Sequence, residues 1–307
     1  MSKSMSGRPT QSGSRRSGRQ SEPPLIPVLA VVGVGLIGGS FAAALRQVGQ
    51  VGQVLGVGRD AAALARACEL RLIDRSCTLA EAARADVIML ATPVGAMPEL
   101  LRELLPHLGA DTVLTDGGST KQDVVDAARE ALGDEVARFV PGHPVAGSEL
   151  SGPEAARPDL FLGRQVVLTP LAENPPELVQ RVRQAWLACG AHVTEMSAEQ
   201  HDDWLASVSH LPHLLAYAYI AHLAEAPDAS ERMRYAGSGF RDFSRIAAAS
   251  PEMWRDILLA NRTLIRRELD QVREQLLRFD RLLETEKAEE LEALLAQAAE
   301  LRRSWRL

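Results

Sequence analysis

Hydrophobic and polar positions alternate in two different ways along this chain of 307 residues. From Pro27 to about Met196, short apolar runs are separated by stretches rich in Ala and Leu, which is typical of strands that alternate with helices. We predict strands at Val28–Val32, Val54–Val57, Val87–Ala91, Val113–Thr115, Phe139–Val140, Val166–Thr169 and His192–Met196. This order predicts an α/β domain of the Rossmann type, with a doubly wound, mostly parallel sheet covered on both faces.

The strand pattern stops near Ser197, and a helical pattern follows it. Ser197 and Gln200 have the spacing of a capping box, which predicts that a helix and a new domain begin there. Asp202–Glu225 is predicted to be one long apolar helix, and Pro251–Leu307 two or more amphipathic helices. We therefore expect a disordered tail (1–24), a dinucleotide-binding Rossmann domain (25–196) and an all-helical domain for substrate binding and dimerisation (197–307).

One of the predicted helices carries apolar residues at alternating spacings of four and three. These residues are Ile265, Leu269, Val272, Leu276, Phe279 and Leu283. The spacing is that of a coiled-coil seam, with Arg and Glu around it. The seam fits packing within one chain and a homodimer interface equally well.

Composition and charge exclude several classes of partner. The chain is 46% hydrophobic and 24% charged, which is ordinary for a globular protein. The net charge of −6 combines +4 in residues 1–24 with −10 in the remaining residues, which hold 29 basic and 39 acidic side chains. The net negative charge of the residues after position 24 argues against nucleic acid or an anionic membrane as the partner.

Cysteine usage and the N-terminal segment bear on location. Cys68, Cys77 and Cys189 are scattered and form no C-x-x-C motif, which favours a reducing, cytoplasmic location. No run of about 18 apolar residues occurs, so no membrane span is expected. Residues 1–24 lack an apolar stretch, so we expect a disordered tail, or a start codon assigned too early, rather than a targeting signal.

A glycine-rich turn follows the first predicted strand. Gly33, Gly35 and Gly38 form G-x-G-x-x-G directly before a helical pattern. The first glycine permits the tight turn, the second lets the backbone approach a pyrophosphate, and the third allows close packing of helix on sheet. The N–H groups at the start of the helix, around Leu36 and Ile37, would then face the phosphates. This context predicts a dinucleotide-binding site.

The end of the second predicted strand bears on which dinucleotide binds. An enzyme that uses NAD normally has Asp or Glu there, to bind the ribose 2′-hydroxyl. Here the position is Gly58, and Arg59 follows it. A small residue followed by a guanidinium can hold a 2′-phosphate, so NADP is favoured over NAD. NAD stays possible if the strand ends one or two residues later, because Asp60 would then take the acidic position.

Several further motifs lie where ligands are expected. Thr92-Pro93, Asp116–Lys121 and Gly142–Gly152 follow predicted strands, and Ser209–His213 and Gly239–Arg245 belong to the helical half. Together these motifs resemble the prephenate/arogenate dehydrogenase (cyclohexadienyl dehydrogenase) family, from about Val31 to about Asn261. G-x-G-L-I-G-G-S, G-H-P-x-A-G-S-E and S-H-L-P-H are specific as a set. The resemblance implies a homodimer that oxidatively decarboxylates prephenate to 4-hydroxyphenylpyruvate, or arogenate to tyrosine.

The resemblance also implies roles for individual residues, and the chemistry is consistent with them. Hydride loss from the carbon that bears the hydroxyl requires a proton acceptor on that hydroxyl. His143 of the G-H-P motif is the expected acceptor, because an imidazole with a pKa of about 6.5 is largely neutral in the cytosol. The resemblance places Ser119 beside it, orienting the substrate. On the residues alone, a loop histidine bonded to backbone around Pro144 is the favoured interpretation of His143.

Substrate carboxylates require cations, for which Arg245 is our first choice, because its planar fork can hold a carboxylate bidentately. Arg241 lies four residues earlier, on the same face if this segment is helical, and relatives often have lysine near this position. The resemblance brings Ser209 and His213 to the substrate from the helical domain. Glu149 and Trp254 are candidates for a gating residue and a pocket wall. Thr92 and Pro93 complete the expected cofactor contacts, with the turn residues named above.

The sequence leaves some alternatives open. His210 and His213 have no third ligand nearby, so no metal site is expected. A hydroxyacid or 6-phosphogluconate-type dehydrogenase would need a catalytic lysine on the interdomain helix, but Asp202–Glu225 contains no lysine. A protein that senses NAD(P) without catalysis is a further alternative. Between the two substrates prephenate is preferred, because no added carboxylate near Ser209–His213 clearly demands the ammonium of arogenate.

Overall fold

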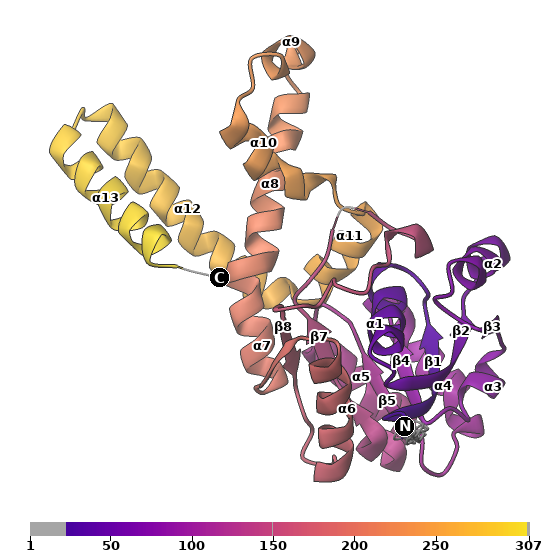
Figure 1. Ribbon diagram of the computed structural model, residues 1–307. Helices are drawn as coiled ribbons and strands as arrows, with labels where there is room; N and C mark the ends of the chain where they lie inside the picture. The colour runs from indigo at the N-terminus through magenta and orange to yellow at the C-terminus, as the bar shows by residue number, and fades with distance from the viewer. Residues whose placement is uncertain (1–22, 149, 306–307) are drawn as a thin grey trace, which may run out of the picture.

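The structure, a computed structural model, describes residues 23–148 and 150–305. A six-stranded sheet forms the centre of the N-terminal half, and all its strand pairs are parallel (Figure 1). Its strand order is β3-β2-β1-β4-β5-β6. The strands are β1 (Ile26–Val32), β2 (Val51–Val57), β3 (Arg75–Ser76), β4 (Val87–Leu90), β5 (Val113–Asp116) and β6 (Phe139–Val140). The chain changes direction between β1 and β4, which is where open α/β sheets bind ligands.

Helices cover both faces of this sheet, as predicted. They are α1 (Leu36–Gln47), α2 (Ala61–Glu69), α3 (Leu79–Ala82), α4 (Met97–Leu104), α5 (Gln122–Leu132) and α6 (Pro176–Ala188). Successive residues of β1 enter different cores, since Val31 packs in a cluster with Phe41 and Trp186, whereas Val32 packs in one with Leu101. A strand buried on both faces reads as a continuous apolar run, which is why β1 could be predicted.

The six-stranded parallel sheet confirms the predicted Rossmann-type fold, and the last strands of this half form a separate small sheet beside it. Its strands are β7 (Gly142–Pro144), β8 (Gln165–Leu168) and β9 (His192–Glu195), in that order. β7 is antiparallel to β8, and β8 is parallel to β9. The apolar pattern located β8 and β9 but missed β7, because Gly and Pro at the ends of a three-residue strand read as a loop.

The C-terminal half is helical throughout the described residues. It consists of α7 (Ala198–Leu205), a π-helical turn (Ala206–His210), α8 (Leu211–Ala224), α9 (Ala229–Met233), α10 (Ser238–Ser244), a 3-10 turn (Arg245–Ala248), α11 (Pro251–Ala260), α12 (Arg262–Glu284) and α13 (Ala288–Ser304). The long helix predicted over Asp202–Glu225 therefore begins earlier and is interrupted. Pro212 accounts for the π-helical turn, because proline has no N–H and its ring clashes with the carbonyl four residues before it.

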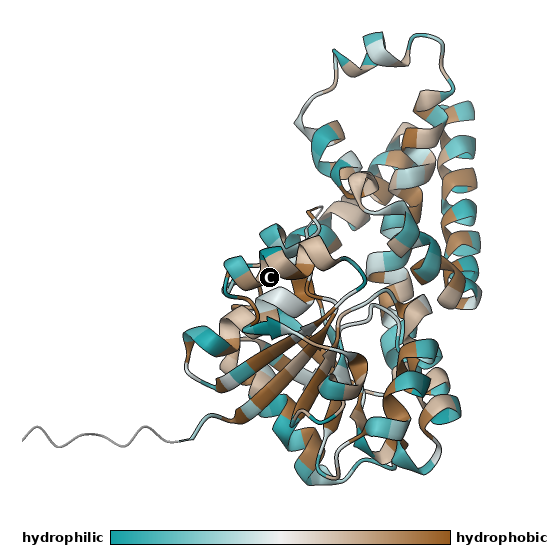
Figure 2. Cartoon of the chain, turned by 90° about the vertical axis from the view of Figure 1, so that its right-hand side faces the viewer, coloured by the Kyte–Doolittle hydropathy of each residue, from teal (hydrophilic) through white to brown (hydrophobic). Residues whose placement is uncertain are grey.

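The α12–α13 hairpin extends away from the rest of the chain (Figure 1). The predicted seam lies along α12, where Ile265 is buried, whereas Leu276 and Leu283 are exposed. Hydrophobic residues line the helices of this half on several sides (Figure 2). The seam is thus only partly covered within one chain.

Two predictions concern the location of the protein: a disordered N-terminal tail and the absence of a membrane span. Residues 1–22 of the predicted tail lie outside the described part of the chain. Within residues 23–148 and 150–305, none of the helices combines the length and the apolar character that crossing a membrane requires.

Candidate active site

The glycine turn after β1 has the shape that a dinucleotide requires. Gly33 has a φ of +94°, and a Cβ on it would lie 2.6 Å from the carbonyl oxygen of Ala91. A Cβ on Gly38 would lie 2.4 Å from the carbonyl oxygen of Gly33. At Gly35 a Cβ would meet no atom within 4 Å. The turn is therefore tight where it packs on β4 and open at its middle glycine, where a pyrophosphate would approach.

The start of α1 completes this turn. Gly35 is the N-cap residue, Leu36 and Ile37 form the first turn, and no side chain caps the helix. Its first N–H groups are therefore available to an anion. Thr92 and Pro93 follow β4 at the same edge, and Thr92 Cγ2 lies 3.1 Å from the Cβ position of Gly33. The residues present fit a dinucleotide at the point where the strand order reverses.

Gly58 is the first residue after β2, as expected from the sequence. β2 ends at Val57, and the exposed Gly58 and Arg59 follow it. Asp60 is the N-cap residue of α2, and its Oδ1 accepts hydrogen bonds from the backbone N–H groups of Ala62 (2.8 Å) and Ala63 (3.3 Å). The carboxylate of Asp60 is thus occupied by the helix, and the strand does not extend to it.

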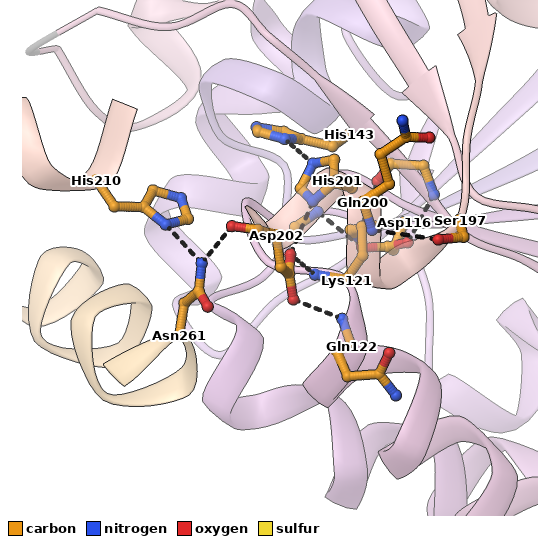
Figure 3. Close-up of polar contacts among 12 residues, drawn as sticks. Asp116, Lys121, Gln122, His143, Ser197, Gln200, His201, Asp202, His210 and Asn261 are labelled. Carbon is orange, nitrogen blue, oxygen red and sulfur yellow. Dashed lines mark hydrogen bonds and ion pairs between the residues drawn. The ribbon is translucent and has the colours of Figure 1, made fainter. Parts of the chain in front are cut away.

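His143 lies at the centre of β7, buried, and paired with Val167 in the antiparallel ladder. Its Nδ1 lies 2.8 Å from Nε2 of His201 (Figure 3). Burial lowers the pKa of His143 well below its usual value, and the charges that His201 and Lys121 can carry lower it further. The imidazole is therefore neutral at neutral pH, as a proton acceptor must be.

A buried ion pair fixes the strand that carries His143. The ammonium of Lys121 contacts the carboxylate of Asp116, and it donates to the carbonyl oxygen of Gly142 (3.0 Å). Asp116 also accepts from the backbone N–H groups of Gly118 (2.8 Å) and Gly142 (2.9 Å). Because both charges are fully buried and share several hydrogen bonds, the pair joins the turn after β5 to β7.

Ser119 lies on that same turn and is half-buried. Between Ser119 and His143 the described residues form no hydrogen bond; Nδ1 of His143 is bonded to His201 instead. Ser119 thus lies on the turn that the Asp116–Lys121 pair joins to β7, without a hydrogen bond to His143 among the described residues. Sequence reasoning singled out the Asp116–Lys121 segment without its ion pair, and it missed His201 and Asp202, which bond to His143 and Lys121, 58 and 81 positions away.

A second group of predicted residues comes together in the helical half. Nδ1 of His213 donates to the carbonyl oxygen of Ser209 (2.9 Å), and its ring is stacked on Trp254, with centroids 3.7 Å apart. Burial lowers the pKa of His213, and the positive charge of Arg245 lowers it further. Ser209, His213, Trp254 and Arg245 therefore form one cluster.

Other predicted residues have different surroundings. Arg241 lies on α10, where its side chain is 77% exposed and lies 3.5 Å from Asp242. Glu149 lies outside the described residues. His210 is buried, with Nδ1 3.2 Å from Nδ2 of Asn261, and burial lowers its pKa to about 4. Within the described chain, no three His, Cys, Asp or Glu side chains are grouped as metal ligands would be.

Comparisons with known proteins agree with this geometry. Residues 41–195 match the family described as "Prephenate dehydrogenase, nucleotide-binding domain", and residues 197–297 match "Prephenate dehydrogenase, dimerization domain". The chain is 36% identical over 237 residues to the cyclohexadienyl dehydrogenase of Zymomonas mobilis, covering 76% of this chain and 80% of that protein. It is also 36% identical over 272 residues to the prephenate dehydrogenase of Bacillus subtilis, covering 86% of this chain and 72% of that protein.

A solved structure is similar over nearly its whole length. The prephenate dehydrogenase of A. aeolicus, in complex with hydroxyphenyl propionate and NAD+, has a TM-score of 0.84 and 35% identity to this chain. The match covers 90% of this chain and 97% of that one. The chain therefore belongs to the prephenate dehydrogenase family of NAD(P)-dependent oxidoreductases, whose activity it has in tyrosine biosynthesis.

Proposed function

We propose that His143 is the proton acceptor in the oxidative decarboxylation of prephenate to 4-hydroxyphenylpyruvate, with NADP+ as the preferred cofactor. The observation that carries this proposal is a neutral, buried imidazole beside the dinucleotide turn. Gly117 connects the two, because its Cβ position lies 2.9 Å from the side chain of Ile37 on α1 and 3.7 Å from Cδ of Pro144, the residue after His143.

The reaction combines a hydride transfer, a proton transfer and a decarboxylation. The nicotinamide, when bound, accepts the hydride that leaves the ring carbon bearing the hydroxyl. Nε2 of His143 takes the proton of that hydroxyl, which lets the carbon–oxygen bond gain double-bond character as the hydride leaves. The ring carboxylate then departs as carbon dioxide, and the electron pair of the broken carbon–carbon bond makes the ring aromatic. His143 returns its proton to the resulting phenolate oxygen.

The carboxylates of the substrate require a cationic, partly apolar pocket. Arg245 is the cation of the cluster formed with Ser209, His213 and Trp254, and its fork can hold a carboxylate bidentately. His213 donates through Nδ1 to backbone, so its Nε2 remains for the side-chain end of the substrate. In this proposal Ser119, Arg241 and Glu149 also contact the substrate or close over it.

The test is an assay of reduced nicotinamide with prephenate or arogenate, each with NADP+ and with NAD+. We expect the highest kcat/KM with prephenate and NADP+, together with release of one carbon dioxide per reduced nicotinamide. Preferential turnover of arogenate would replace the proposed substrate. No turnover in any of the four combinations would contradict the proposed activity.

The cofactor preference yields a prediction at the end of β2. Gly58→Asp introduces a carboxylate where a 2′-phosphate would bind, and its Cβ would meet only the side chain of Leu64, at 3.4 Å or more. We expect NADP+ to bind on the order of 10-fold more weakly and NAD+ equally or more tightly. Arg59→Ala should likewise weaken NADP+ much more than NAD+. Titration of both cofactors checks this, and equal losses for both would refute the assignment.

We propose a homodimer that buries the apolar surface of α8. This helix has no charged residue in its 14 positions, yet only Leu211 and Ala216 are buried within the chain. A helix that is apolar all round is normally covered on all sides. The matching family description, which calls this region a dimerization domain, supports a second copy as the cover.

A charge placed on α8 should therefore separate the subunits. Ala218 is exposed on α8, and Ala218→Arg would bury a guanidinium in the proposed interface at a cost of several kcal/mol. We expect a dimer for the unmodified chain and a monomer for the variant by sedimentation velocity. The matched control is Ala65→Arg, at an exposed position of α2 in the dinucleotide-binding half, which should remain dimeric.

We also place the reaction in the cytoplasm, since the three cysteines are unpaired.

A further inference from the structure

Two hydrogen bonds extend from His143 into the first helix of the helical half (Figure 3). Nδ1 of His143 lies 2.8 Å from Nε2 of His201, and Nδ1 of His201 lies 2.8 Å from Oδ1 of Asp202. All three side chains are buried, and the two rings meet edge to face with centroids 5.0 Å apart. The three residues form a continuous chain of one carboxylate and two imidazoles.

Asp202 is held in place and ionised by the start of α5. Its Oδ1 accepts from the backbone N–H of Lys121 and its Oδ2 from that of Gln122, both at 2.8 Å. α5 has no side-chain cap of its own, so Asp202 supplies one from another helix and gains from the positive end of the helix dipole. Burial raises the pKa of Asp202, but hydrogen bonds from His201 and these two N–H groups outweigh it, and the pKa is lowered.

The ionised carboxylate determines where the protons of both imidazoles lie. A carboxylate can only accept, so Nδ1 of His201 carries a proton and donates it to Asp202. Burial lowers the pKa of His201, which is therefore neutral with a bare Nε2. Nε2 of His201 must then accept from Nδ1–H of His143. This leaves Nε2 of His143 unprotonated, and it has no hydrogen-bond partner among residues 23–148 and 150–305.

We propose that His201, held by Asp202, is a positioning residue that keeps His143 in the tautomer with a bare Nε2 and stabilises the imidazolium formed during the reaction. The proposal rests on the role of His143 proposed above. The hydroxyl proton moves to Nε2, while Nδ1–H stays in its bond to His201, and no proton passes to Asp202. If the hydrogen bond ran the other way, Nε2 of His143 would carry the proton and could not accept another.

The charged groups around the two rings are consistent with this role. The ammonium of Lys121 disfavours a cation on His143, but it is neutralised by Asp116. His210 also disfavours the cation, although burial keeps His210 itself neutral near pH 7. The carboxylate of Asp202 is thus the anion left to favour the imidazolium, and it acts through His201.

The tautomer can be measured without catalysis. In protein labelled with 15N at its seven histidines, two-bond proton–nitrogen couplings report which ring nitrogen carries the proton. The signals of His143 are identified by their loss in His143→Asn. We expect Nδ1–H with a bare Nε2 for His143 at pH 7.5, in protein without cofactor. A proton on Nε2 would overturn the proposal.

Variants at His201 separate positioning from a merely structural role. His201→Phe removes the acceptor, so we expect a mixed or reversed tautomer at His143 and a kcat lower on the order of 10²-fold, with cofactor affinity unchanged. His201→Gln offers an amide oxygen where Nε2 lies, and it should restore the tautomer and bring kcat to within about 10-fold of the unmodified enzyme.

The outcomes distinguish this inference from the proposed function. An unmodified enzyme that is inactive on every substrate contradicts the function, whatever its tautomer. An active enzyme whose His201→Phe variant keeps both its kcat and its His143 tautomer overturns the positioning role. If His201→Phe does not fold, the positioning role is tested by the His143 tautomer in the unmodified protein and by the tautomer and kcat of His201→Gln.

Discussion

Replacement of His143 by asparagine is expected to lower kcat by about 10²–10⁴-fold and to leave cofactor affinity unchanged. Asparagine keeps a polar side chain on β7 that can still donate to His201, so the strand and its ladder with β8 should remain. It has no lone pair basic enough to take the hydroxyl proton. Steady-state kinetics with prephenate, together with NADP+ titration of the same preparation, separates lost chemistry from lost binding.

The matched control for this variant is His192→Asn, because His192 lies on β9 of the same small sheet and is exposed. Its kcat should equal that of the unmodified enzyme. If His143→Asn kept kcat within a few-fold of the value for the unmodified enzyme, another group would have to be the proton acceptor.

The pH dependence of the unmodified enzyme follows from the environment of the same ring. The base works only when neutral, so kcat/KM falls as the pH drops through the pKa of His143. Burial and neighbouring charges place that pKa well below its usual value, near 6.5 for an exposed histidine. We therefore expect kcat/KM to hold from pH 8 down through 6.5 and to fall only in more acidic solution. An acid limb centred at or above 6.5 would indicate a solvated base.

The sequence permitted prediction of those features that arise from local geometry. Gly33, Gly35 and Gly38 could be interpreted because a tight turn between a buried strand and a helix imposes its demands within six residues. The other five strands of the parallel sheet were equally accessible, since burial on both faces produces continuous apolar runs, but β3 (Arg75–Ser76) was missed because this exposed two-residue edge strand has no apolar residue. Ser209, His213 and Trp254 could be named only through the resemblance, and the structure brings them together.

The features that escaped prediction depend on contacts between distant segments. His143 and His201 are 58 positions apart, and Asp202 caps a helix that begins 80 positions before it. No local pattern marks such a pair, because His-Asp in the first turns of a helix is typical of a helix face in contact with water. β7 was missed for a related reason: its three residues become a strand only because β8 and the Asp116–Lys121 pair hold them there.

Replacement of Gly35 by valine is expected to weaken NADP+ and NAD+ on the order of 10²-fold, about 3 kcal/mol, with little change in the melting temperature. Gly35 has an extended backbone (φ −108°, ψ −152°) that valine adopts readily, and its Cβ would meet no protein atom within 4 Å. The added side chain would instead fill the space in which the pyrophosphate approaches the first turn of α1. Calorimetric titration of both cofactors and thermal unfolding of the same sample measure the two effects.

Gly237→Val supplies the matched control, because Gly237 is also an N-cap residue with extended backbone (φ −94°, ψ −170°) and open space at its Cβ position. It precedes α10 in the helical half, so its cofactor affinity should equal that of the unmodified chain. By contrast, a valine side chain on Gly33 would collide with the backbone of Ala91, directly after β4, and would disrupt the turn. The middle glycine therefore isolates the effect on binding. Unchanged cofactor affinity in the Gly35→Val protein would mean that the dinucleotide does not lie against this turn.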